Sequence, residues 1–149
     1  MSTQGWIRRI FLFALLFVVS VVLQSTLFHF LKIGGVKPDL LLIIVILSAV
    51  MNGKKTGAGL GFAYGLMEDL IVGRYIGLQA LTKMSTGYLI GLLERKVFSD
   101  NVLVPVVVGA LGTLIHNLLV FTTLFLVGNF DFFSPEYFLN YSLASCLYN

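Results

Sequence analysis

The residues of this chain that could do chemistry in apolar surroundings are a carboxylate, an ammonium group and an imidazole. Asp69 and Lys83 lie on either side of a short predicted turn, and His116 and Asn117 lie together in a long apolar stretch. Burying an unpaired charge is costly, so such residues are paired, hydrated or functional. We predict that Asp69 and Lys83 form an ion pair that sets the register of two helices. The alternatives are a binding or coupling site that opens outward, and two side chains that extend separately to water.

Glycines at four-residue spacing surround this pair. The spacing joins Gly57, Gly61, Gly65 and Asp69 before the turn, and Lys83, Gly87 and Gly91 after it. Residues four apart share one helix face, and glycine there lets two helix backbones approach closely. We therefore predict an antiparallel helical hairpin with these residues opposite one another: Gly61 and Gly91, Gly65 and Gly87, Asp69 and Lys83.

Other polar residues have simpler predicted roles. His116 and Asn117 are expected to form interhelical hydrogen bonds, since a proton relay needs further titratable partners and the other histidine, His29, lies near a predicted helix end. Gly112, four residues before His116, predicts a second close-packed face. Glu68 lies about 100° around the helix from the ladder face, so we expect it at the outer interface.

The amino-acid composition indicates which medium surrounds the chain. The chain is 58% hydrophobic and 11% charged, and its mean hydropathy is +0.95. These values are typical of an integral membrane protein, and 149 residues provide about six spans of roughly 20 residues each. We predict a single domain, an all-α bundle of about six short transmembrane helices at residues 10–30, 38–52, 56–72, 77–93, 102–127 and 135–149. Pro38 and Asp39 suit the first turn of the second helix.

The basic residues of the loops predict orientation. With six spans and a cytoplasmic N-terminus, six basic residues lie inside and three outside. The inside set is Arg8, Arg9, Lys54, Lys55, Arg95 and Lys96, and the outside set is Lys32, Lys37 and Arg74. A re-entrant second helix with the N-terminus outside also gives six to three, so charge alone leaves both arrangements open. We favour the first because Arg8 and Arg9 directly precede the first span.

Several functions are excluded or disfavoured. No nucleophile with a neighbouring base, and no facing pair of aspartates, can be assembled at one depth, so we expect no enzyme. The single Cys146 cannot form an internal disulfide, and no metal-ligand spacing is present. The net charge of +3 is scattered over short loops, which excludes nucleic-acid binding as a main role. We expect no cofactor.

Five motifs in order carry a family resemblance. They are Leu23–Leu27 with Gln24, Lys37–Ile43 with Pro38 and Asp39, Gly61–Leu70, Gly77–Leu81 and Gly87–Leu92. Together these motifs resemble the MreD family of rod shape-determining proteins. Members normally continue past Leu147-Tyr148-Asn149 into a basic tail, so whether the last helix crosses fully is an open question.

The resemblance implies a non-enzymatic, multi-pass component of the bacterial plasma (inner) membrane. Such proteins bind MreC, and through it act with the MreB filament, an elongation glycosyltransferase and a class B penicillin-binding protein in peptidoglycan synthesis. The family is also distantly similar to the substrate-binding subunits of energy-coupling-factor transporters. The alternative function is therefore capture of a vitamin or small solute, which would need more convergent polar groups than this chain offers.

Overall fold

The computed structural model describes residues 3–26, 39–72, 75–92, 103–128 and 135–148, and these ranges contain helices and turns without strands. In chain order the helices are α1 (Thr3–Thr26), α2 (Leu40–Asn52), α3 (Lys54–Val72), α4 (Leu78–Leu92), α5 (Leu103–Leu126) and α6 (Pro135–Tyr148). The first helix begins at Thr3, before the predicted start at Ile10, and its predicted end near Phe30 lies outside the described residues. The other bounds lie within two positions of the predicted ones, and the ends of α2 and α3 and the start of α6 match them.

Helix α2 is the core of the molecule. It packs against α1, α3, α4 and α5, and Leu41, Leu42, Val45 and Ala49 are fully buried. A helix that is apolar all round is stable when most of its faces are covered. At about 1.5 Å per residue its 13 residues span roughly 20 Å. The other helices therefore surround a short central helix.

Helices α3 and α4 form the tightest pair. A Cβ atom at Gly61 would lie 2.6 Å from the Lys83 carbonyl carbon, one at Gly65 would lie 2.6 Å from the Ala80 Cα, and one at Gly87 would lie 2.6 Å from the Gly57 carbonyl carbon. Gly91 lies against Gly53 and Lys54 in the same way. The two backbones touch along the whole pair, which only residues without a side chain permit.

The predicted register of this pair is wrong. Gly61 lies against Lys83 rather than Gly91, and Gly65 lies against Gln79 and Ala80 rather than Gly87. The prediction assumed that the end of α3 and the start of α4 lie at the same height beside the turn. In the structure α3 continues past the start of α4, because the Asp69 carboxylate, one turn beyond Gly65, binds the first backbone N–H groups of α4.

A single glycine joins α2 to α3. Gly53 adopts φ 84°, and its N–H donates to the Ala49 carbonyl at 2.8 Å. This φ lies in the left-handed region that favours glycine. The helices consequently reverse direction within one residue, and α3 returns directly along α2.

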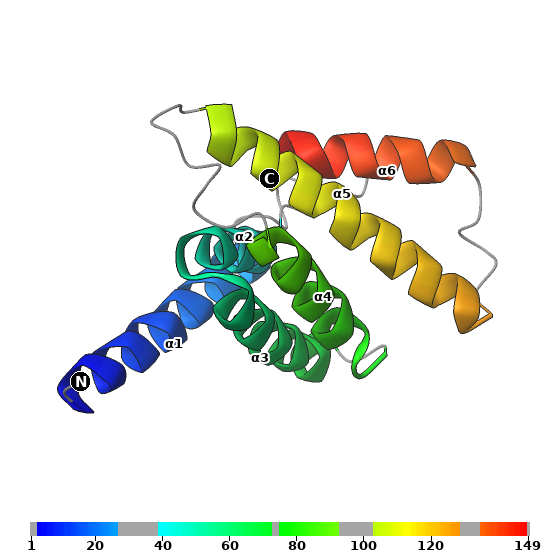
Figure 1. The fold of residues 1–149 in the computed structure, drawn as a ribbon. Helices are drawn as coiled ribbons and strands as arrows, with labels where there is room; N and C mark the ends of the chain where they lie inside the picture. Colours follow the sequence, from blue (N-terminus) through cyan, green and yellow to red (C-terminus); the bar gives the residue numbers. More distant parts are fainter. Residues whose placement is uncertain (1–2, 27–38, 73–74, 93–102, 129–134, 149) are drawn as a thin grey trace.

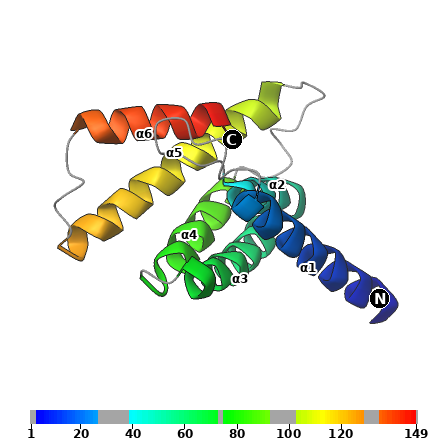
Figure 2. The same cartoon turned by 180° about the vertical axis from the view of Figure 1, so that it is seen from behind.

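The remaining helices attach at two sides. Tyr64 of α3 donates its hydroxyl hydrogen to the Phe13 carbonyl of α1 at 2.7 Å, and the Phe17 and Tyr64 rings lie 5.4 Å apart. On the other side α5 packs on α4 and α2, and α6 packs on α5. Figures 1 and 2 show α5 and α6 side by side as a second layer, with the N-terminal half of α1 projecting away from the bundle.

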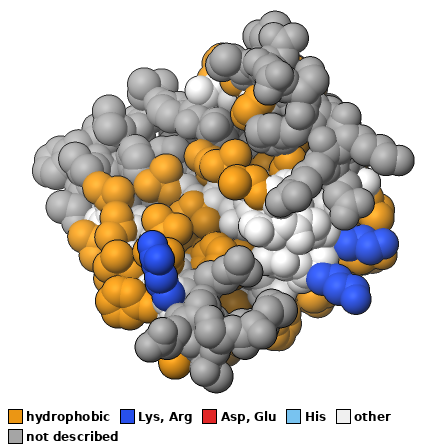
Figure 3. All heavy atoms as spheres, turned by 60° about the vertical axis from the view of Figure 1, so that its left-hand side comes forward, with side chains coloured by type: hydrophobic (Ala, Val, Ile, Leu, Met, Phe, Trp, Pro, Cys, Tyr) orange, Lys and Arg blue, Asp and Glu red, His pale blue; other side chains and the backbone are white. Residues whose placement is uncertain are grey.

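One segment among the described residues, Pro105–Leu126 of α5, is long and apolar enough to cross a membrane, with a mean hydropathy of 1.8. Shorter apolar segments are Phe11–Leu23, Leu40–Asn52 and Phe138–Leu147. Figure 3 shows a face on which hydrophobic side chains dominate the described surface and a few basic side chains are exposed. Large apolar side chains are also exposed along α1, including Phe11, Leu15 and Val18.

The glycine contacts give a matched test of helix packing. Gly61→Ala should lower the free energy of unfolding by about 1–3 kcal/mol, because the new methyl group meets the rigid α4 backbone. Gly59→Ala on the same helix is the control, since a Cβ atom there has nothing within 4 Å, and it should be neutral or stabilising by about 1 kcal/mol. Denaturation in detergent measures both, and equal effects would contradict the packing.

Candidate functional site

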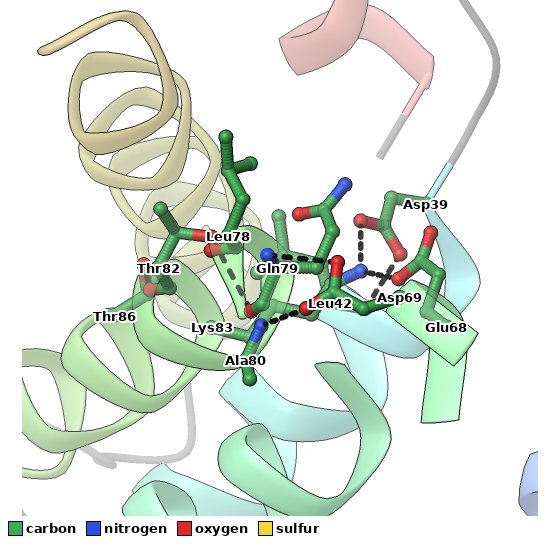
Figure 4. A network of polar contacts seen from close by, with 10 residues as sticks. All are labelled: Asp39, Leu42, Glu68, Asp69, Leu78, Gln79, Ala80, Thr82, Lys83 and Thr86. Atoms are coloured by element: carbon green, nitrogen blue, oxygen red, sulfur yellow. Dashed lines mark hydrogen bonds and ion pairs between the residues drawn. The ribbon is translucent and has the colours of Figure 1, made fainter. Parts of the chain in front are cut away.

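Three helix ends meet at a cluster of charged side chains. Asp39 directly precedes α2, Glu68 and Asp69 lie near the end of α3, and Lys83 lies in the second turn of α4. Figure 4 shows these side chains converging, with the Lys83 ammonium group between Asp39 and Glu68. We call Asp39, Glu68 and Lys83 the charge cluster.

Lys83 is the centre of this cluster and is fully buried, with 0% of its surface exposed. Its Nζ lies 2.8 Å from Asp39 Oδ2 and also donates to Glu68 Oε2. The carboxylates keep 20% and 19% of their side-chain surface exposed. A buried ammonium group requires paired charge and hydrogen bonds, so removing its partners would leave a costly unpaired charge.

Asp39 joins two helices with its two oxygens. Its Oδ1 accepts from the Leu42 N–H at 2.9 Å, which caps the first turn of α2, while Oδ2 pairs with Lys83. A carboxylate at this position is also stabilised by the positive end of the helix dipole. Asp39 therefore links the start of α2 to the interior of α4.

Asp69 has a different partner from the predicted one. Its side chain is buried, and it accepts backbone N–H groups from Gly77 at 2.9 Å, Gln79 at 3.1 Å and Ala80 at 3.0 Å. It is the cap of α4, contributed by the preceding helix. The predicted Asp69–Lys83 ion pair is wrong, because the Asp69 oxygens are occupied by these N–H groups and Lys83 extends to Asp39 and Glu68.

Glu68 has a partner that the sequence analysis did not assign to it, because its carboxylate pairs with Lys83. Glu68 follows Tyr64 by one turn, and Tyr64 packs against Leu41 and Val45 of α2. Residues 61, 64 and 68 therefore share the α3 face that meets the neighbouring helices. This three- and four-residue spacing was the signal in the sequence that places Glu68 on the packed face of α3.

His116 and Asn117 are buried in the middle of α5. The His116 Nδ1 and the Asn117 Nδ2 are buried without a hydrogen-bond partner in the part of the chain that the structure describes. The interhelical hydrogen bonds predicted for these residues are thus not formed by these two atoms. Gly112, one turn earlier, lies against the Ile46 side chain of α2.

The remaining predicted residues are less informative. Gln24 lies in α1, but its side chain, like Pro38, is outside the described residues. Cys146 lies in α6 as a free thiol whose Sγ contacts the Ala110 carbonyl at 3.6 Å. Within the described ranges, no group of three or more His, Cys, Asp or Glu side chains could hold a metal ion.

Residues 4–149 match the family described as rod shape-determining protein MreD. The chain belongs to the MreD family. The match covers essentially the whole chain, so rod shape determination is the role that the family indicates, and membership places the chain in a family of membrane proteins. Searches of curated proteins and of solved structures found no significant match.

A double-mutant cycle separates the observed pairs from the predicted one. Lys83→Met should lower the free energy of unfolding by about 3 kcal/mol because two carboxylates lose their partner. Asp39→Asn combined with Lys83→Met should cost clearly less than the sum of the two single changes.

Asp69→Ala provides the matched comparison. It should cost about 1–2 kcal/mol through loss of the α4 cap, and it should be additive with Lys83→Met to within about 0.5 kcal/mol. Thermal and chemical unfolding in detergent give the free energies of unfolding of the three single and the two double variants. Strong coupling of Asp69 to Lys83 would restore the pairing predicted from the sequence.

Proposed function

We propose that this chain is a non-enzymatic membrane scaffold of the bacterial cell-elongation complex. In this role it binds MreC and thereby supports lateral peptidoglycan synthesis and rod shape. Contact with MreB, the elongation glycosyltransferase and the class B penicillin-binding protein is then indirect. Membership of the MreD family supports the role in cell shape, and the details of binding are part of the proposal.

The observation that carries a scaffold function is the use of the charged side chains. Asp69 caps the start of α4. Lys83 pairs with Asp39 and Glu68 and so connects α2, α3 and α4. Catalytic groups need access to a substrate and a positioned nucleophile or base. Side chains arranged to hold helix ends together instead stabilise a fixed shape that a partner can recognise.

We further propose a multi-pass bundle of six helices in the plasma membrane, similar to the substrate-binding subunits of energy-coupling-factor transporters. The apolar length of α5 and the exposed apolar side chains of α1 support insertion in a bilayer. The basic residues around Arg8 and Lys54 support cytoplasmic placement of the N-terminus and of the α2–α3 turn.

Depletion in the host and purification test this function. Cells that lose the protein should change from rods to rounded cells, and detergent extracts should yield the protein bound to MreC in a constant ratio. Lys83→Met should lower both the fraction of rod-shaped cells and the recovery of the complex, because it removes the ion pairs that hold the helix ends together. Light microscopy and quantitative mass spectrometry measure these outcomes.

A solute-capture function predicts different results. Purified protein would carry a stoichiometric small molecule and associate with an ATPase module, and depleted cells would stay rod-shaped while their growth depended on a nutrient. These observations together would contradict the scaffold proposal.

Labelling of single cysteines tests the topology. In a Cys146→Ser background, cysteines at Lys54 and Arg74 should react with an impermeant thiol reagent from opposite sides of the membrane, because α3 lies between them. Right-side-out and inverted vesicles supply the two sides. Reaction of both positions from the same side would exclude the proposed orientation of α3.

A further inference from the structure

Helix α6 has an exposed stripe on the side that faces away from the bundle. Figures 1 and 2 show α6 at the edge of the molecule, with α5 between it and the helices α2, α3 and α4. It packs chiefly on α5. Its buried residues, Ser142 and Ser145, lie on the other side of the helix from the stripe. We call the exposed residues the α6 stripe: Glu136, Leu139, Asn140, Leu143 and Leu147.

The spacing of the α6 stripe is that of a coiled-coil seam. Positions 136, 140, 143 and 147 are separated by four, three and four residues, as the a and d positions of a heptad repeat are. Asn140 and Leu147 take the a positions, and Leu143 takes a d position. A single asparagine at an a position is typical of two parallel helices, because the two amides hydrogen-bond to each other and set the register. Leu147 is 89% exposed, more than any other large hydrophobic residue described.

Asn140 lies at a depth where an exposed amide meets hydrocarbon. Phe138 and Tyr141, on either side of it in α6, both contact the ring of Phe121 in α5. Phe121 belongs to the membrane-length segment Pro105–Leu126 and lies about 8 Å inside its C-terminal end, at about 1.5 Å per residue. The asparagine side chain is too short to reach water over that distance. An amide exposed to hydrocarbon is costly, so it indicates a hydrogen-bonding partner from outside the bundle.

We propose that the α6 stripe docks on the same stripe of a second copy of this chain in the membrane. The inference goes beyond the scaffold function and rests on the bilayer insertion proposed above. All copies of a membrane protein share one orientation, so a twofold axis along the membrane normal makes the two α6 helices parallel. The two Asn140 side chains then meet at one depth. A carboxamide carries both a donor and an acceptor, so it is complementary to its own copy.

Other occupants fit the α6 stripe less well. Acyl chains of lipid offer Asn140 no hydrogen bond. A helix of another protein would need a polar residue at the matching depth, which a second copy supplies by symmetry. In a bilayer, apolar surface alone does not drive helices together, whereas close packing and hydrogen bonds across the contact do. Glu136 precedes the apolar segment Phe138–Leu147, so its charge lies toward the membrane surface, where water and salt screen it.

Disulfide formation tests the contact in the full chain in lipid vesicles. In a Cys146→Ser background, Leu143→Cys should give a disulfide-linked dimer on mild oxidation, because d residues of parallel paired helices lie opposite each other. Leu70→Cys, at an exposed position of α3, is the matched control for random collisions. We expect several-fold more linked dimer from Leu143→Cys than from Leu70→Cys.

Energy transfer between donor-labelled and acceptor-labelled chains, measured as the vesicles are diluted with lipid, gives the dissociation constant of the dimer. Asn140→Leu should raise this constant about three- to tenfold, because that is the contribution of one hydrogen bond between helices in a membrane. Thr122→Leu, at an exposed position of α5, is the matched control and should leave the constant unchanged. Thermal unfolding checks that each variant is folded.

Three results would overturn the inference. They are wild-type protein that stays monomeric at every protein-to-lipid ratio, equal linking of Leu143→Cys and Leu70→Cys, and an unchanged dissociation constant for folded Asn140→Leu protein. A monomer whose binding of MreC depends on Asn140 would assign the α6 stripe to MreC and also overturn it. Binding of MreC by the wild-type chain tests the scaffold function separately, so the two proposals can fail independently.

Discussion

Lys83 places a positive charge in the interior of an apolar helical bundle, and the rest of the arrangement depends on keeping that charge paired. An ammonium group without surface exposure needs carboxylates within hydrogen-bonding distance, because no water can replace them. Asp39 and Glu68 supply them from two other helices. The start of α2, the end of α3 and the second turn of α4 are consequently held at one point.

Close backbone packing makes this arrangement possible. Packed helices usually lie 8–10 Å apart from axis to axis, and the side chains at the contact set this distance. Glycines at positions 57, 61, 65 and 87 let the α3 and α4 backbones approach more closely than side chains would allow, and Gly61 contacts the Lys83 backbone itself. Asp69 then caps α4 across the same contact. Packing, capping and ion pairing therefore stabilise the same relative position of α3 and α4.

The sequence indicated where the helices lie and which glycines pack closely, but it did not indicate which charged side chains pair. Glycine spacing identified the residues that lie against another backbone, and Pro38-Asp39 indicated the start of α2, because both signals depend on local geometry. The partner of Lys83 was not predictable in this way. It depends on how far α3 extends past α4, and that distance is set by the Asp69 cap, a contact between two helices. Asp39 was recognised as a helix start, but its second oxygen binds Lys83 from a distant part of the chain.

The ion pairs and the cap that hold the helix ends together also bear on the proposed scaffold function. A bundle whose charged groups hold helix ends together presents a constant surface, and the Asp39 and Glu68 carboxylates lie where that surface is partly accessible. The family match supports a role in rod shape. Among the described residues, the buried side-chain atoms without a hydrogen-bond partner are Gln79 Oε1, His116 Nδ1, Asn117 Nδ2 and Ser142 Oγ.

Solid-state NMR of the isotope-labelled protein in lipid bilayers tests the central pairing most directly. Through-space correlations from the ¹⁵Nζ of Lys83 should reach the side-chain carboxyl carbons of Asp39 and Glu68, and none should reach the carboxyl carbon of Asp69. A correlation to Asp69, or the absence of correlations to both Asp39 and Glu68, would contradict the account.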